Sequence, residues 1–153
     1  MDKYYSIYQG IVVDIKDPLK IGRCRIKVPS VHGNISKSDY NLLPWAIYRS
    51  PYPSGSGRSS FILPKVGDVV WVEFINGDKR MPSYSGSSFA NKEGTSEVPV
   101  SESEYGSTDV VYSSDGAIIK KTSNELRLEY NGAYISLTST GEIILKGVKI
   151  HLN

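Results

Sequence analysis

The chain has 153 residues with a net charge of +2, and it contains 14 glycines, 11 tyrosines and one cysteine. This length predicts one domain, or one small domain with an appendage, and the single cysteine excludes an intrachain disulfide framework. Residues 1–5 do not lead into an apolar core of signal-peptide length. No stretch approaches the ~20 apolar residues of a membrane span, so we expect a soluble product of the cytoplasm. Apolar residues nowhere keep helical spacing, whereas glycine and tyrosine favour turns and strands, so the sequence predicts an all-β protein.

Five short strands are predicted in the first half of the chain, at residues 9–15, 21–28 and 43–48 and as a pair between residue 69 and about residue 86. The first strand carries Ile11, Val13 and Ile15 on one face. Asn76-Gly77 favours the positive φ of a two-residue hairpin turn, and we expect this turn to join the last two strands. Five strands with a long connection between the third and the fourth predict a closed barrel of the oligonucleotide/oligosaccharide-binding (OB) type, which leaves few unpaired strand edges.

The second strand shows the clearest alternation. One face carries Cys24, Ile26 and Val28, and the other carries the bases Arg23, Arg25 and Lys27. OB barrels bind single-stranded nucleic acid through a basic groove with stacking aromatic side chains, and such residues lie nearby in sequence at Tyr4, Tyr5, Tyr8, Trp45 and Tyr48. A basic row is also typical of the solvated face of an antiparallel strand. Because the acidic second half does not fit a single-strand binder, nucleic-acid binding is the alternative hypothesis and we expect none.

An acidic segment follows the predicted barrel. It contains five acidic residues against the single base Lys92, and it is rich in serine, glycine and threonine: Glu93, Glu97, Glu102, Glu104 and Asp109. We interpret residues 90–109 as an extended linker between a barrel domain at residues 1–89 and a second β-region at residues 110–153.

The second β-region combines short strands with recurrent turn signals, and the strands are predicted at residues 117–121, 125–130, 133–138, 142–145 and 148–152. Leu126, Leu128 and Tyr130 alternate with Arg127 and Glu129, so each such strand has an apolar face that needs a cover. About 44 residues of short strands cannot bury those faces alone. We therefore expect copies of the chain to wrap around one another in a threefold closed assembly, with the apolar faces on a common axis.

Several stretches of the first half stand in an order typical of one known family: Gly10-Ile11-Val12, Asp17–Arg23, Val28–Gly33, Leu43–Ala46 and Pro64–Phe74, then Gly77-Asp78, Pro82 and Gly86-Ser87. Through them the chain resembles the OB domain of phage tail central-spike proteins. That family includes the T4-type spike, baseplate assembly protein V and the valine-glycine repeat spike of type VI secretion. Residues 110–153 resemble the intertwined triple-stranded β-helix that follows this domain. T4-type spikes carry a lysozyme domain between the two parts, whereas the linker here is too short for an enzyme fold.

The resemblance implies a structural protein of the virion tail baseplate, or of a phage-like injection machine, that is synthesised in the host cytoplasm. It implies a homotrimer that links the baseplate hub to a membrane-piercing tip, transmits force and contacts the host envelope transiently. We expect a separate tip protein at the C-terminal end and no enzymatic activity. Axial packing of the trimer is predicted for five apolar residues: Ile135, Leu137, Val148, Ile150 and Leu152.

Candidate catalytic and metal-binding residues have structural interpretations. Cys24 lies among apolar residues on the inward face of a strand, which favours a core residue over a nucleophile. His32 stands in a turn without a second histidine or a cysteine beside it, and residues 50–58 lack the Gly-Lys-Ser/Thr ending of a phosphate loop. Three His151 side chains around an axis could bind a metal, but alternation places His151 with Lys149, so we expect a solvated residue. The sequence therefore predicts no catalytic, cofactor or metal site.

Overall fold

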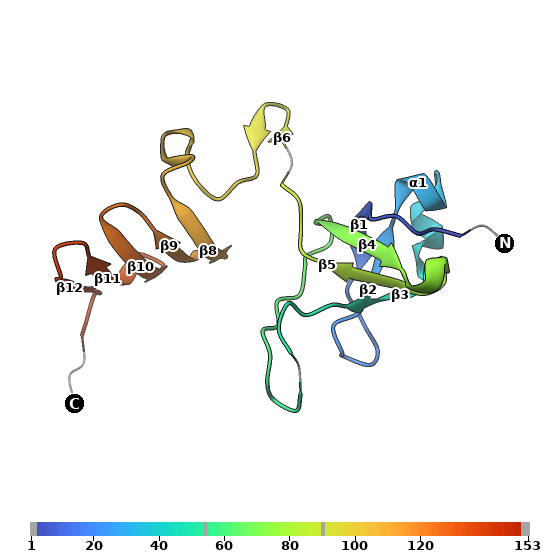
Figure 1. Ribbon diagram of the computed structural model, residues 1–153, viewed down its shortest axis with the longest axis horizontal. Helices are drawn as coiled ribbons and strands as arrows, with labels where there is room; N and C mark the ends of the chain where they lie inside the picture. Colours follow the sequence, from blue (N-terminus) through green and yellow to red (C-terminus); the bar gives the residue numbers. More distant parts are fainter. Residues whose placement is uncertain (1–2, 54, 90, 151–153) are drawn as a thin grey trace. The chain divides into compact units, whose positions relative to one another are not determined.

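The computed structural model describes residues 3–53, 55–89 and 91–150. The chain divides into two compact units, residues 1–89 and 90–153. The first unit is a closed barrel; the second contains a two-stranded hairpin and a five-stranded antiparallel sheet, which we call the C-terminal sheet (Figure 1). Helices among the described residues are short segments of three to six residues, so the protein is all-β as predicted.

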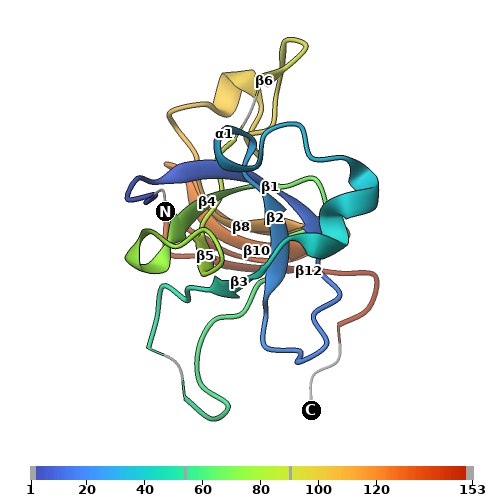
Figure 2. The ribbon, with the colours of Figure 1, turned by 90° about the vertical axis from the view of Figure 1, so that its right-hand side faces the viewer.

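Five strands close the barrel in the order β1-β2-β3-β5-β4 (Figure 2). Their bounds are β1 Tyr8–Asp14, β2 Cys24–Lys27, β3 Trp45–Tyr48, β4 Val69–Phe74 and β5 Pro82–Ser85. β3 and β5 run parallel, and the other neighbouring pairs are antiparallel. The connection between β2 and β3 contains α1 (Pro29–His32) and the 3-10 helix η1 (Lys37–Leu42). This is the closed OB-like barrel that the strand pattern predicted.

The barrel interior holds the apolar core. Cys24, Ile26 and Val28 are buried, which confirms the alternation predicted for the second strand. The other four strands of the barrel contribute the remaining buried side chains of this core: Val12, Ala46, Val70, Val72, Phe74 and Tyr84. Because every strand of the closed sheet turns one face inward, these side chains cover one another without help from another chain.

The inward face of the first strand is not the face of Ile11, Val13 and Ile15 that the sequence analysis described. Gly10 and Val12 are its buried residues, whereas Ile11 is exposed and Val13 is half-buried. A bulge after Val12 shifts the alternation, so that Ile15 packs against the core beyond the strand. The face of Ile11, Val13 and Ile15 is therefore not a continuous interior face, because a bulge breaks the period of two.

The connection between β4 and β5 is longer than the predicted two-residue turn. Asn76 and Gly77 do have positive φ values, of 54° and 70°. They belong, however, to the 3-10 turn η2 (Ile75–Gly77), and the loop continues to residue 81 before β5 begins. The carboxylate of Asp78 accepts the Arg80 N–H at 2.9 Å and pairs with the guanidinium of Arg80 at 2.7 Å. The prediction of a tight two-residue hairpin was wrong: the loop closes where the N–H of Ile75 donates to the carbonyl of Met81 at 2.9 Å.

Asp17 organises the turn between β1 and β2. Its buried carboxylate accepts backbone N–H groups from Leu19 at 3.0 Å, Ile21 at 2.9 Å and Arg23 at 3.2 Å. The guanidinium of Arg23 adds a charged pair at 2.7 Å. These bonds hold the pKa of Asp17 well below its ordinary value, with the Arg23 side chain as the largest cause. One buried side chain thus satisfies the polar groups of the whole turn.

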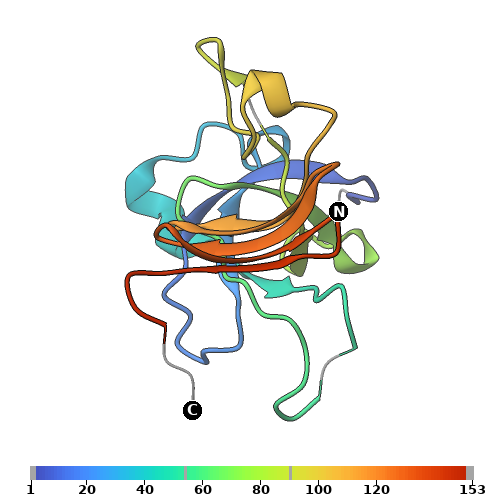
Figure 3. The same ribbon diagram turned by 90° about the vertical axis from the view of Figure 1, so that its left-hand side faces the viewer.

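The C-terminal sheet is a meander in the order β12-β11-β10-β9-β8, and its strands lie side by side in Figure 3. The bounds are β8 Asp109–Ser114, β9 Ala117–Lys121, β10 Glu125–Tyr130, β11 Ala133–Thr138 and β12 Ile143–Lys146. Two tight turns follow the predicted chemistry: Asp115 and Asn131 have φ near +50° and each precedes a glycine at +83°. The bounds of β9, β10 and β11 agree with the prediction, whereas β8 was not predicted.

The acidic segment, interpreted as a linker whose order the sequence left open, contains regular elements. It forms the hairpin of β6 (Asn91–Lys92) and β7 (Thr95–Ser96), whose turn places Glu93 and Gly94 at positive φ. It also forms the 3-10 turn η3 (Glu102–Glu104), which Ser101 and Glu104 close as a capping box. At the other end, residues 148–150 form no strand, and the remainder of the predicted strand, His151 and Leu152, lies outside the described residues.

We expect Gly10→Ala to destabilise the barrel. A Cβ atom at Gly10 would press on Ile26 Cγ2 and would lie 2.9 Å from Val72 Cγ2. Overpacking of this kind lowers the free energy of unfolding by about 1–3 kcal/mol, which denaturant titration measures. Gly147→Ala is the matched control, because Gly147 has no positive φ and no neighbouring atom closer than 3.6 Å. Equal stability of the two variants would contradict the enclosed position of Gly10.

Asp17 should make the barrel sensitive to acid. Because its folded pKa is depressed, the unfolded chain takes up the proton at higher pH than the barrel does. The contribution to stability is therefore complete above about pH 4 and is lost as the pH falls toward the folded pKa. We expect Asp17→Asn to melt at a lower temperature at neutral pH and to lose less stability on acidification. Asp109→Asn, at an exposed position, should keep the wild-type profile.

Candidate functional site

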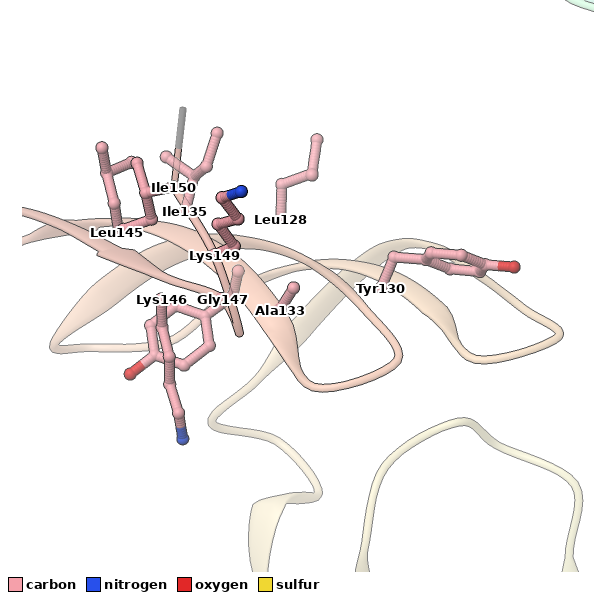
Figure 4. Close-up of a pocket in the computed structure, with 10 residues that line it drawn as sticks. Leu128, Tyr130, Ala133, Ile135, Leu145, Lys146, Gly147, Lys149 and Ile150 are labelled. Atoms are coloured by element: carbon pink, nitrogen blue, oxygen red, sulfur yellow. The ribbon is translucent and has the colours of Figure 1, made fainter. Parts of the chain in front are cut away.

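The register of the C-terminal sheet brings apolar residues to one face. Leu128 on β10 pairs with Ile135 on β11, and Ile135 pairs with Leu145 on β12. Figure 4 shows these three side chains projecting from the same side of the sheet. Neighbouring pairs in the same register extend the set, which we call the apolar face: Ile119, Leu126, Leu128, Ile135, Leu137, Ile143 and Leu145.

The apolar face has no cover within the described part of the chain. Its members on β10, β11 and β12 are between 46% and 70% exposed. Every buried apolar side chain among the described residues belongs to the barrel, and in the C-terminal sheet only Ser136 is buried. A single sheet with one apolar face is stable in water only when a second layer packs on that face. The apolar face is therefore the surface of this chain that most clearly requires a partner.

The five residues predicted to pack on the axis do not lie on one face of the sheet. Ile135 and Leu137 lie together on the apolar face. Ile150, beyond β12, lines an open groove of about 360 Å³ together with Ile135 and other members of that face (Figure 4). Val148 is fully exposed and does not line this groove. Leu152 lies outside the described residues.

The sequence contained a signal for the rest of the apolar face that the prediction did not use. Asn131-Gly132 is a two-residue turn, so the residues flanking it, Tyr130 and Ala133, must pair. Two residues further from the turn on each strand, Leu128 therefore lies opposite Ile135. The same counting identifies the other members on β10, which the prediction described as alternating but did not assign to the axis.

The family of the chain is identified through its barrel. Residues 8–89, from the start of β1 to just beyond β5, match the model of the type VI secretion system/phage-baseplate injector OB domain. The chain belongs to this family. A comparison with curated proteins gave no match to the chain. Membership in the injector OB-domain family indicates a structural role in a baseplate, as the sequence resemblance implied. The hairpin and the C-terminal sheet lie beyond the matched residues.

Cys24 and His32 have structural roles in this injector OB domain. Cys24 is buried, its Sγ lies 3.4 Å from the hydroxyl of Tyr84, and burial raises the pKa of its thiol, which opposes a nucleophilic role. Tyr84 in turn donates to the carbonyl of Gly22 at 2.6 Å. The Nδ1 atom of His32 accepts the N–H of Val28 at 2.9 Å. Burial, and then the positive charge of Lys79, lower the pKa of the His32 imidazole. Both residues stabilise the fold, as the sequence indicated.

The described residues offer neither a metal centre nor a membrane anchor of the helical kind. No group of three or more His, Cys, Asp or Glu side chains within them is arranged to hold a metal ion. No helix in the same ranges is long and apolar enough to cross a membrane. His151, the one histidine considered as a metal ligand, lies outside these ranges.

The basic row on β2 is largely engaged within the barrel. Arg23 pairs with Asp17, as described above. Arg25 stacks on Trp45 with its guanidinium carbon 4.6 Å from the ring centroid, and it donates to the carbonyl of Tyr40 at 3.4 Å. The indole and two of the three bases that could form a nucleic-acid surface therefore bond to each other or to the fold. This arrangement favours the solvated structural face over a groove for single strands.

We expect the purified protein not to bind single-stranded DNA. With Arg23 and Arg25 engaged within the barrel, this row leaves only Lys27 to contact a phosphate, whereas binding to single strands requires several such contacts. Fluorescence anisotropy of a labelled oligonucleotide across a salt series should show no saturable binding up to about 100 µM protein at physiological salt. Binding that saturates and weakens with salt, and that Arg25→Ala removes, would instead revive the nucleic-acid hypothesis.

Proposed function

We propose that the chain is a central-spike protein of a phage tail baseplate, or of a phage-like injection machine, in which three copies assemble around one axis. In this role it links the baseplate hub to a separate tip protein and transmits force during penetration of the host envelope. The observation that carries the proposal is the uncovered apolar face, in a chain whose barrel belongs to the injector OB-domain family.

Further copies of the same chain are the cover that fits the apolar face best. From β9 to β12 the face is apolar except at Lys121, which pairs with Leu126 at the end of β9 and lies 3.8 Å from a carboxylate oxygen of Asp109. A second such face can therefore pack on the apolar part without leaving a charge buried and unpaired. With three copies, each apolar face packs against two others, and the edge strands of each sheet lie beside neighbouring chains. The three sheets would form the intertwined triple-stranded β-helix of the homotrimer, with five residues directed to its axis: Ile135, Leu137, Val148, Ile150 and Leu152.

Transmission of force follows from the backbone bonding of the spike. Each strand from β8 to β12 is joined to its neighbours by an antiparallel ladder. Bending such a stack would break many backbone hydrogen bonds together, which makes it stiff. The barrel has a core of its own, so it can be held by the hub while the sheets carry the load. In this role the protein needs no catalytic group.

Light scattering on the purified full-length chain tests the proposal. We expect a mass of three times the 16.9 kDa of one chain. Ile135→Asp would bring three carboxylates to the axis, where unpaired charges are costly to bury, so we expect this variant to be monomeric. Ile144→Asp is the matched control: Ile144 pairs with Ser136 on the opposite face of the sheet, so the trimer should persist.

Two results would contradict parts of the proposal separately. A wild-type chain that stays monomeric at every concentration tested would overturn the spike itself. A trimer that tolerates Ile135→Asp with an unchanged melting temperature would keep the assembly but remove the apolar face from its axis.

A further inference from the structure

The opposite face of the C-terminal sheet is polar, and its charged groups bond to one another. The guanidinium of Arg127 lies 3.0 Å from a carboxylate oxygen of Glu125 and 3.2 Å from one of Glu129. Its central carbon lies 4.0 Å from the ring centroid of Tyr134 on the next strand. The buried hydroxyl of Ser136 donates to Glu125. We call these five residues the Arg127 network.

Other parts of the chain also lie on this polar face. Lys120 on β9 reaches Glu104 of η3 at 3.4 Å, so the 3-10 turn is held against the sheet on the side of the Arg127 network. The capping box with Ser101 orients Glu104 for this contact. On the far strand, the ammonium of Lys146 lies 5.6 Å from the ring centroid of Tyr134. The polar face therefore already has a partial cover made by its own chain.

The polar face is more enclosed than the apolar one, which reverses the usual arrangement. The side chains of Glu125, Arg127 and Glu129 are 19%, 24% and 29% exposed, well below the values of the apolar face. Burial alone would lower the pKa of Arg127, but the bonds to Glu125 and Glu129 raise it above its ordinary value. The hydroxyl of Ser136, and then Arg127, hold the pKa of Glu125 below its ordinary value. Both shifts favour the charged forms of Glu125 and Arg127.

We propose that the Arg127 network decides which face of the sheet turns toward the axis of the assembly. The inference rests on the proposed function and identifies the residues that give the assembly its specificity. Turning the network inward would bury three copies of a charged cluster, at a high cost in desolvation, so only the other orientation is available. A sheet without the network would keep Lys120 and Lys146 on that face, but its two faces would differ much less in polarity, and the packing of either one would become competitive. Single polar residues select one packing arrangement of coiled coils in the same way.

The full-length variant Glu125→Thr/Arg127→Val/Glu129→Thr tests this assignment. It removes the three charges together, so no carboxylate is left unpaired, and threonine and valine suit a strand. The face that turns inward is read from cysteines introduced separately at Ile143, on the apolar face, and at Ile144, on the polar face, because the native Cys24 is buried. With the network intact, we expect the thiol at position 143 to be modified about tenfold or more slowly than the thiol at position 144.

The charge-exchanged variant Glu125→Arg/Arg127→Glu/Glu129→Arg is the matched control, because it keeps two ion pairs on the same face. We expect this control to remain a trimer with the same difference in thiol reactivity. The uncharged variant should lose that difference and should populate species other than the trimer in light scattering.

Each other result has a distinct meaning. An uncharged variant that keeps both the trimer and the difference would overturn the role of the network while leaving the spike intact. An uncharged variant that is unfolded by circular dichroism would also overturn it, because the network would then serve the fold and not the choice of face. A monomeric wild-type chain would instead show that the proposed function itself has failed.

Discussion

Strands place successive side chains on opposite faces, and every apolar face that results must be covered. The barrel meets this constraint within one chain, because closure turns the inner faces of all five strands toward one another. The C-terminal sheet has the same alternation but does not close, and within the described residues nothing packs on its apolar face. Two units built from the same kind of strand therefore differ in one respect: the first encloses an apolar core, and the second exposes an apolar face.

The residues through which the chain resembles its family have structural tasks that the geometry explains. Gly10 is needed because β1 passes so close to Ile26 and Val72 that no side chain fits. Asp17 is needed because a turn of exposed backbone N–H groups must be satisfied at the mouth of the barrel. These requirements concern closure of the barrel and involve no reacting group.

Much of this structure could be predicted from alternation and turn chemistry, and the failures have local causes. The bounds of β9, β10 and β11 were predictable because two Asx-Gly turns fix where each strand must end. Strand β8 was missed because a bulge between Val110 and Tyr112 breaks its alternation. The loop after β4 was mistaken for a tight turn because Asn76 and Gly77 do have positive φ, although the backbone closes only between Ile75 and Met81. Alternation predicted a shared face for Leu126 and Leu128, but the prediction did not pair the strands and so did not find their partners. Val148 and Ile150 lie beyond the last strand, where alternation no longer fixes direction.

The apolar face is determined by residues that take no part in it. A shift of one residue in the pairing of two strands would move every side chain of a strand to the other face. The turns at Asp115-Gly116 and Asn131-Gly132 prevent that shift, because their positive φ values suit only one two-residue connection. These turns separate Leu128 and Ile135 from Arg127 and Ser136, and the ion pairs of Arg127 then make the two faces chemically unequal. The turns fix the register, the register separates the apolar from the charged side chains, and that separation leaves the sheet with one apolar and one charged face.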